Sequence, residues 1–189
     1  MNATSSLLDP NLPILRLSVA RYHAMRDAGI LTEADRVELL GGLLVPKMTK
    51  NPPHSLATEL VRRALADVVP PGWYVRIQEP VTTSDSEPEP DLAVVRGDPR
   101  DYAERHPRGG DVGIVVEVAA ESLNRDRTDK RRIYAQAGIE TYWVVNLREA
   151  LVEVYGRGGG MRRHRRGETV AVVVEGARWG QVDVDAMLP

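Results

Sequence analysis

Apolar residues recur along this chain at two spacings, which predict helices that alternate with strands. The clearest stripe of helical period predicts a helix that ends at Pro70-Pro71-Gly72. The members of this stripe are Ala57, Leu60, Val61, Ala64, Leu65 and Val68. A shorter helix is expected from Ser18, whose hydroxyl can cap it, to Gly29. Residues 1–15 contain several Pro and Asn residues and are expected to form an N-terminal arm.

Apolar or alternating runs predict strands over much of the remaining chain. They are residues 37–40 and 43–45, which Gly41-Gly42 joins into a hairpin, and then 73–77, 92–95, 112–118 and 141–145. A helix is expected from Asp126 to Gly138, between the last two of these strands. A final hairpin is predicted from residues 151–155 against 169–174, with 156–167 as its connecting loop. We therefore expect an α/β fold in which residues 16–189 form one domain, a mixed β-sheet flanked by α-helices with an added C-terminal β-hairpin.

Composition narrows the class of protein. The chain has 189 residues, 42% of them hydrophobic, and a formal net charge of −2, so it can form one core and has no excess of basic residues. It contains no Cys, which excludes disulfides, thiolate zinc sites and cysteine nucleophiles. No apolar run is long enough to cross a membrane, and the N-terminus lacks the features of a signal peptide. We therefore expect a cytoplasmic protein with no membrane partner.

Two charged residues occupy positions that the pattern assigns to the interior. Glu117 lies within the apolar run Val112–Val118, where an ionised carboxylate costs several kcal/mol unless a partner or a metal compensates it. Lys130 lies three and four residues before Ile133 and Tyr134, on the stripe of the next helix that packs on the sheet. A buried acid on a strand and an inward lysine on the following helix are what a metal-assisted phosphodiester site requires.

Three other polar residues each allow two interpretations. Asp91 follows Pro90 at the mouth of a predicted strand, either as a site residue or as an ordinary turn aspartate. His54 precedes the apolar stripe of its helix by one turn, so it either points into a pocket or has a structural or capping role. Glu38 is the acid of the first predicted strand, and alternation also allows it to face solvent.

The predicted loop 156–167 carries a cluster of basic residues. They are Arg157, Arg162, Arg163, His164, Arg165 and Arg166. Such a cluster either follows a phosphate backbone, with Arg162 and Arg163 as candidate contacts, or is simply a solvated hairpin tip.

An ordered set of short motifs resembles the Uma-two family of restriction-type endonucleases. The set comprises Val37-Glu-Leu-Leu with its glycine turn, His54, Pro90-Asp91, Val116-Glu117-Val118, Asp126, Lys130, Tyr134, Ala137-Gly138 and Tyr142-Trp143-Val144-Val145. The resemblance extends from about Ser18 to Leu188. The family is regarded as a branch of the PD-(D/E)XK nuclease superfamily, which implies the restriction-endonuclease-like fold.

The resemblance also implies roles for individual residues. Asp91 corresponds to the aspartate of the PD pair and Glu117 to the acid of the (D/E)XK part, and both would be metal ligands. The lysine expected two positions after Glu117 is absent, because position 119 is Ala, and the basic group moves to Lys130. Glu38 would be a further acid and metal ligand from near the N-terminus. Carboxylates of this kind bind a hard divalent cation such as Mg²⁺, or Mn²⁺ in its place.

The resulting hypothesis is a metal-dependent endonuclease that hydrolyses phosphodiester bonds in DNA. Lys50 and His54 are candidate substrate or pocket residues, and Lys47 or Lys50 could take the place of Lys130. Cleavage of both strands needs two active sites, so a homodimer is expected. Two alternatives remain open. One is a non-catalytic module that binds nucleic acid or protein on the same fold, and the other is a nuclease that acts on RNA or branched DNA.

Overall fold

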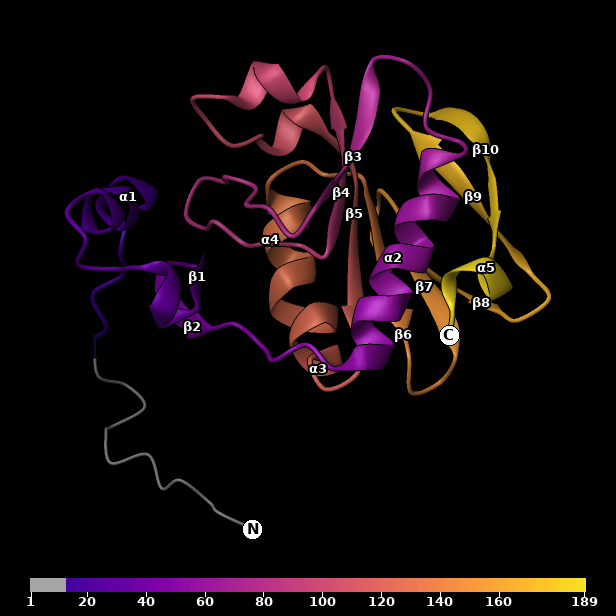
Figure 1. Cartoon of the computed structure of the whole chain (residues 1–189), viewed down its shortest axis with the longest axis horizontal. Coiled ribbons are helices and arrows are strands. Elements are labelled where there is room, and N and C mark those ends of the chain that lie inside the picture. Colours follow the sequence, from indigo (N-terminus) through magenta and orange to yellow (C-terminus); the bar gives the residue numbers. More distant parts are fainter. Residues whose placement is uncertain (1–12) are drawn as a thin grey trace, which may run out of the picture.

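The computed structural model describes residues 13–189, and its centre is a six-stranded mixed sheet (Figure 1). The strands, in spatial order, are β3 (Trp73–Ile77), β4 (Leu92–Arg96), β5 (Val112–Ala119), β6 (Thr141–Asn146), β7 (Leu151–Tyr155) and β8 (Met161–Arg165). Strands β5 and β6 pair in parallel and the other neighbours pair antiparallel. The predicted fold class is therefore confirmed.

The two faces of the sheet are covered by different elements. One face packs against α2 (Pro52–Ala66), the hairpin of β9 (Thr169–Val174) and β10 (Ala177–Asp183), and α5 (Val184–Met187), with an entirely apolar cluster between them. The other face packs against a helical segment made of α3 (Leu123–Arg125), the π-helical turn η4 (Asp126–Lys130) and α4 (Arg131–Gln136). We call residues 123–136 the site helix. Figure 1 shows α2 and α4 on opposite sides of the central strands.

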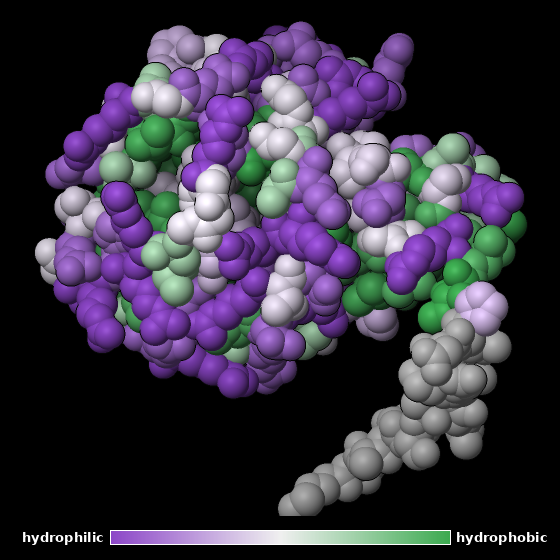
Figure 2. Space-filling view, turned by 180° about the vertical axis from the view of Figure 1, so that it is seen from behind, coloured by the Kyte–Doolittle hydropathy of each residue, from purple (hydrophilic) through white to green (hydrophobic). Residues whose placement is uncertain are grey.

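An N-terminal lobe lies beside the sheet. It contains α1 (Val19–Asp27), the short helix η1 (Glu33–Asp35) and the predicted hairpin of β1 (Val37–Leu40) and β2 (Leu43–Pro46). The backbone N–H of Glu87 donates to the carbonyl of Leu39 at 2.7 Å and so joins the lobe to the segment before β4. Figure 2 shows apolar side chains on the surface of this lobe. In the N-terminal part of the described chain, Ile14, Leu15 and Ile30 are 64%, 77% and 66% exposed.

Two further short helices, η2 (Pro99–Tyr102) and η3 (Gly109–Asp111), lie in the connection between β4 and β5. Of the predicted N-terminal arm, residues 1–12 lie outside the described residues, and residues 13–15 contain no helix or strand. Within residues 13–189, no helix is both long and apolar enough to span a membrane.

The predicted pairing of residues 151–155 with 169–174 is wrong. Strand β7 pairs instead with β8, and β9 pairs with β10. The pattern of apolar residues did not predict β8, because four of its five residues are Arg or His. Strand β8 is the outer edge of the sheet, where no apolar alternation is required. The added C-terminal hairpin exists, but it consists of β9 and β10 around Glu175 and Gly176, both of which have positive φ (51° and 78°).

Candidate active site

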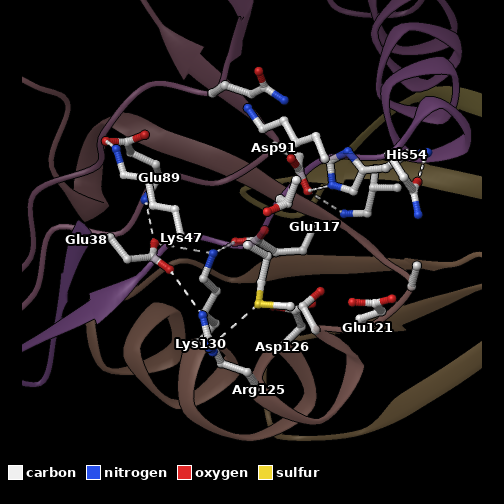
Figure 3. A pocket seen from close by; sticks show the side chains of 18 residues that line it. Glu38, Lys47, His54, Glu89, Asp91, Glu117, Glu121, Arg125, Asp126 and Lys130 are labelled. Atoms are coloured by element: carbon white, nitrogen blue, oxygen red, sulfur yellow. Dashed lines mark hydrogen bonds and ion pairs between the residues drawn. The ribbon is translucent and has the colours of Figure 1, made fainter. Parts of the chain in front are cut away.

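A cavity of about 300 Å³ opens where β5 ends, between the N-terminal lobe, the start of α2 and the site helix (Figure 3). Its titratable lining residues are Glu38, Lys47, Lys50, His54, Glu89, Asp91, Glu117, Glu121, Arg125, Asp126 and Lys130. The structure therefore brings together all four predicted catalytic residues, which come from β1, the segment before β4, β5 and the site helix. The chain has three lysines in total, and all three line this cavity.

Glu117 faces the site helix because it alternates with Val116 and Val118, which join the apolar cluster on the opposite face. It is 4% exposed, and its Oε1 accepts hydrogen bonds from Lys130 Nζ at 2.9 Å and Tyr134 Oη at 2.7 Å. Burial raises the pKa of Glu117 well above its ordinary value; Lys130 opposes this shift, while three nearby acids add to it. Four buried acids therefore surround one buried lysine.

Lys130 lies at the end of the π-helical turn, and this turn separates the two α-helical parts of the site helix. Its Nζ lies 3.5 Å from Glu38 Oε2, in addition to its bond with Glu117. Burial acts to lower the pKa of Lys130, but Glu117, Glu38 and Asp126 outweigh burial, so the pKa lies above its ordinary value. The side chain is therefore an ammonium ion at neutral pH.

Asp91 lies beside Glu117 at the end of the sheet, because Leu92 pairs with Val116 in the adjacent register position. Asp91 Oδ2 accepts a hydrogen bond from the backbone N–H of Val118 at 2.8 Å and lies 3.1 Å from His54 Nε2. A carboxylate only accepts, so this ring nitrogen is the donor. Burial acts to raise the pKa of Asp91, but the bonds from His54 and Val118 outweigh it, and the pKa lies below its ordinary value.

His54 therefore points into the cavity, and only its backbone takes part in capping. Its N–H donates to Oδ1 of Asn51, the N-cap residue of α2, at 3.0 Å. Its second ring nitrogen, Nδ1, is buried without a hydrogen-bond partner among residues 13–189.

Glu38 is buried, so the alternative that places it on the solvent face is wrong. Strand β1 directs it into the cavity, where Oε2 accepts a hydrogen bond from the backbone N–H of Glu89 at 3.1 Å. Arg125 Nη1 lies 4.0 Å from Oε1. The Glu89 N–H, Arg125 and Lys130 are thus the partners that compensate the burial of Glu38.

Asp126 is a site residue that the sequence analysis named only within the family resemblance. It is 2% exposed and lines the cavity, and its Oδ2 has no hydrogen-bond partner within the described part of the chain. Burial raises its pKa, and Lys130 opposes the shift. The only sequence signal was its position four residues before Lys130, which places both side chains on one side of a helix.

The two other lysines occupy the outer part of the cavity. Lys47 forms an ion pair with Glu89. Lys50 is exposed overall. Partial loss of water around its ammonium group nevertheless lowers its pKa, and the nearby acids Asp91 and Glu89 only partly oppose this shift. Neither is bonded to Glu117 as Lys130 is.

Arg162 and Arg163 do not line the cavity. Both lie on the edge strand β8, where a loop was predicted. Arg162 borders a separate groove between β8 and β9, and Arg163 Nε lies 3.8 Å from Glu153 Oε1. The structure thus separates these two arginines from the other candidate residues.

The side chains as arranged do not form a complete metal cage. Among the residues that the structure describes, no three His or acidic side chains are placed to hold one ion between them. Asp91 and Glu117 are neighbouring carboxylates on adjacent strands, and Asp126 has an unpartnered oxygen in the same cavity. The arrangement can therefore provide two adjacent carboxylates, a permanent ammonium ion and an additional acid.

Comparisons with known proteins agree with this fold. Residues 19–180 match the sequence profile of the Uma2 family, whose description is "Putative restriction endonuclease". None of the proteins with curated descriptions matches the chain. The crystal structure of a putative nuclease belonging to DUF820 from Anabaena variabilis ATCC 29413 is similar, with a TM-score of 0.69 and 15% sequence identity over 86% of this chain and 96% of that one. At this identity the likeness concerns the fold. The family match covers most of the sequence, and the chain therefore belongs to the Uma2 family of putative restriction endonucleases.

Proposed function

We propose that this protein is a divalent-cation-dependent nuclease that hydrolyses phosphodiester bonds in DNA. The observation that carries the proposal is the buried group of Asp91, Glu117 and Lys130 at one end of the sheet. The family description supports the reaction class.

The donor set fits a hard divalent cation. Mg²⁺ is usually held by one or two carboxylates and keeps several waters, so it does not need a complete protein cage. Asp91 and Glu117 would hold it, with Glu38 as an additional acid. The buried acids Glu38, Asp91, Glu117 and Asp126 share one buried lysine, and Oδ2 of Asp126 has no hydrogen-bond partner among the described residues, so the cavity has carboxylate oxygens available to a cation. A bound Mg²⁺ or Mn²⁺ supplies a water of lowered pKa and offsets charge on the phosphate.

The side chains of this chain would have separate tasks. Lys130 remains charged, so its ammonium group can stabilise negative charge that builds up on the phosphate during hydrolysis. His54 orients Asp91 through its hydrogen bond, and Tyr134 orients Glu117 in the same way. Lys50, which is exposed and lines the cavity, would contact a substrate phosphate.

Cleavage of both DNA strands would need two such sites, so we expect a homodimer. The net charge of −2 favours modest DNA affinity that weakens as salt increases.

A second candidate function is a non-catalytic binding module on the same fold. It is favoured by the bonds that Lys130 makes to Glu117 and His54 to Asp91, because these bonds give the acids partners from the protein itself. In that case the acids would be a structural network and no substrate would be hydrolysed.

A cleavage assay separates the two functions. The purified protein is incubated with supercoiled plasmid, and in parallel with RNA and branched DNA, in Mg²⁺ or Mn²⁺. A matched Lys130→Met variant and an Arg132→Met control on the exposed side of the site helix are prepared identically. We expect the native protein and the control to cut plasmid DNA, and Lys130→Met to lose about 10²–10³-fold in rate. Equal cleavage by Lys130→Met would overturn the role of Lys130, and cleavage of none of these substrates would favour the binding module.

A further inference from the structure

One transverse row of the sheet carries two buried acids on the face that the site helix covers. In the strand register, Glu117 pairs with Val144, Val144 with Glu153, and Glu153 with Arg163. Glu153 therefore lies two strands away from Glu117, at about 10 Å. The site helix contacts this row at both acids, through Lys130 at Glu117 and through Arg127 at Glu153.

The contact at Glu153 has a fixed geometry. Glu153 is fully buried, and the Arg127 guanidinium donates to both of its carboxylate oxygens, with Nε at 3.0 Å from Oε2 and Nη2 on Oε1. Tyr155 Oη donates to Oε2 at 2.7 Å, and Arg127 Nη2 also donates to Glu149 at 3.1 Å. A planar guanidinium bound to a carboxylate through two parallel bonds fixes orientation as well as distance.

Arg127 lies inside the π-helical turn, between Asp126 and Lys130. A π-helical turn is rare within an α-helix and is frequently found at functional sites. Lys130 and Tyr134 hold the helix at Glu117, and Tyr142 Oη donates to the backbone carbonyl of Asp126 at 3.0 Å. The bonds from Arg127 add a second point of the same row, about 10 Å away, and so oppose rotation of the turn about the helix axis.

We propose that Arg127 and Glu153 are positioning residues, whose ion pair sets the rotation of the π-helical turn and so holds Lys130 against Glu117. Neither residue lines the cavity, so they act only through the site helix. The inference rests on the proposed function in so far as Lys130 acts on a substrate, but the position of Lys130 can be measured without any substrate.

Lysine-selective ¹⁵N labelling offers that measurement. The chain has only three lysines, all of which the structure describes, and of these Lys130 alone is buried. Its ammonium protons are bonded to Glu117, so we expect one slowly exchanging ammonium signal in the NMR spectrum of the native protein. That signal reports the Lys130–Glu117 contact.

The test variant is Arg127→Met with Glu153→Met, which removes both charges together. Replacement of a buried ion pair by apolar side chains of similar size usually preserves folding. We expect this variant to keep its circular dichroism spectrum but lose the slowly exchanging signal. We also expect kcat for DNA cleavage to fall about tenfold to a hundredfold with KM little changed. Arg132→Met is the matched control on the same helix and should retain both the signal and the rate.

A folded double variant that keeps the signal and the native rate would overturn the proposal. If the double variant does not fold, the isosteric Glu153→Gln variant decides the matter through the same signal. If the native protein cleaves nothing, loss of the signal still supports the positioning role, while the proposed nuclease function fails separately.

Discussion

Two glutamates in this protein share the same local sequence, the same face of the sheet and the same transverse row, yet their electrostatic environments are opposite. Glu117 lies in Val116-Glu117-Val118 and Glu153 in Val152-Glu153-Val154. Both side chains are almost inaccessible, at 4% and 0% exposure. The pKa of Glu117 is raised well above its ordinary value, whereas that of Glu153 is lowered.

The difference comes from their neighbours. Burial acts to raise the pKa of both residues. At Glu153, the hydrogen bonds from Arg127 and Tyr155 outweigh burial. At Glu117, one ammonium ion is shared with other acids, and the charges of Asp126, Asp91 and Glu38 add to the effect of burial. Glu153 is thus a satisfied structural acid, and Glu117 belongs to a cluster that an additional cation would stabilise.

Removal of the basic side chain that pairs with each acid should give the largest difference in stability between the two sites. Arg127→Met removes the guanidinium bonded to the buried Glu153 and leaves it only the Tyr155 bond and Arg163 at 3.8 Å, so we expect the free energy of unfolding to fall by about 3 kcal/mol. Lys130→Met should cost clearly less, because burial already raises the pKa of Glu117, so its carboxyl can take up a proton once the ammonium ion is removed. Urea denaturation of the two variants measures this, and equal losses would contradict the comparison.

Substitution of the acids themselves should change the free energy of unfolding by a smaller amount. Glu153→Gln replaces an acceptor of the Arg127 fork by an amide donor, so we expect a loss of about 1–3 kcal/mol in the free energy of unfolding. The outcome that would count against a satisfied ion pair is a Glu153→Gln protein as stable as the native one.

Glu117→Gln should have the opposite sign. Gln keeps an oxygen that can accept from Lys130 and Tyr134, and it removes one charge from a cluster of acids. We therefore expect the free energy of unfolding to stay equal or to rise by up to about 1 kcal/mol, while affinity for Mg²⁺ falls. A clear loss of stability at neutral pH would show that the charge of Glu117 is fully compensated.

The pH dependence of these two variants should also diverge. The pKa of Glu153 lies below 4.5, so its charge stabilises the fold above about pH 4.5, and this contribution is lost as pH falls through the folded-state pKa. The pKa of Glu117 lies well above 4.5, so its contribution is present below about pH 4.5 and is lost as pH rises through the folded-state pKa. Relative to the native protein, Glu117→Gln should gain stability as pH rises, and the deficit of Glu153→Gln should shrink as pH falls. Urea titrations at a series of pH values would reveal parallel curves if the two acids were equivalent.

The smallest effect on stability is expected at an ion pair on the outer surface of α2. Glu59 accepts bonds from both Arg62 and Arg63, which lower the pKa of its exposed carboxyl to about 2. Solvent screens such pairs, so Glu59→Gln should leave thermal stability unchanged within error. A measurable loss of thermal stability in Glu59→Gln would mean that the differences among the other variants cannot be attributed to burial alone.

The local sequence shows why only part of this picture was predictable. The strand and helix periods predicted the sheet, α2 and the inward positions of Glu117 and Lys130. They equally place an acid inside the strand that carries Glu153, so the pattern alone does not separate a site acid from a structural one. The pattern singled out Glu117 and Lys130, and the family resemblance gave Asp91, Glu117 and Glu38 their expected roles as metal ligands.

Other features depend on contacts that sequence spacing does not encode. Strand β8 is polar because it is the edge of the sheet, so its arginines indicated a loop. The π-helical turn has no sequence signature of its own, and two of its residues, Arg127 and Lys130, bond to strands distant in the chain.

The most direct test of the central claim is a calorimetric titration of Mg²⁺ and Mn²⁺ into the native protein and into the Asp91→Ala, Glu117→Ala double variant. Each titration is run without DNA and with a short duplex whose linkages are phosphorothioates, so that a cation that enters only with the substrate is also detected. We predict a cation site in the native protein that the double variant lacks. A native protein that is folded yet binds no cation under either condition would contradict the claim that this cavity is a metal-dependent nuclease site.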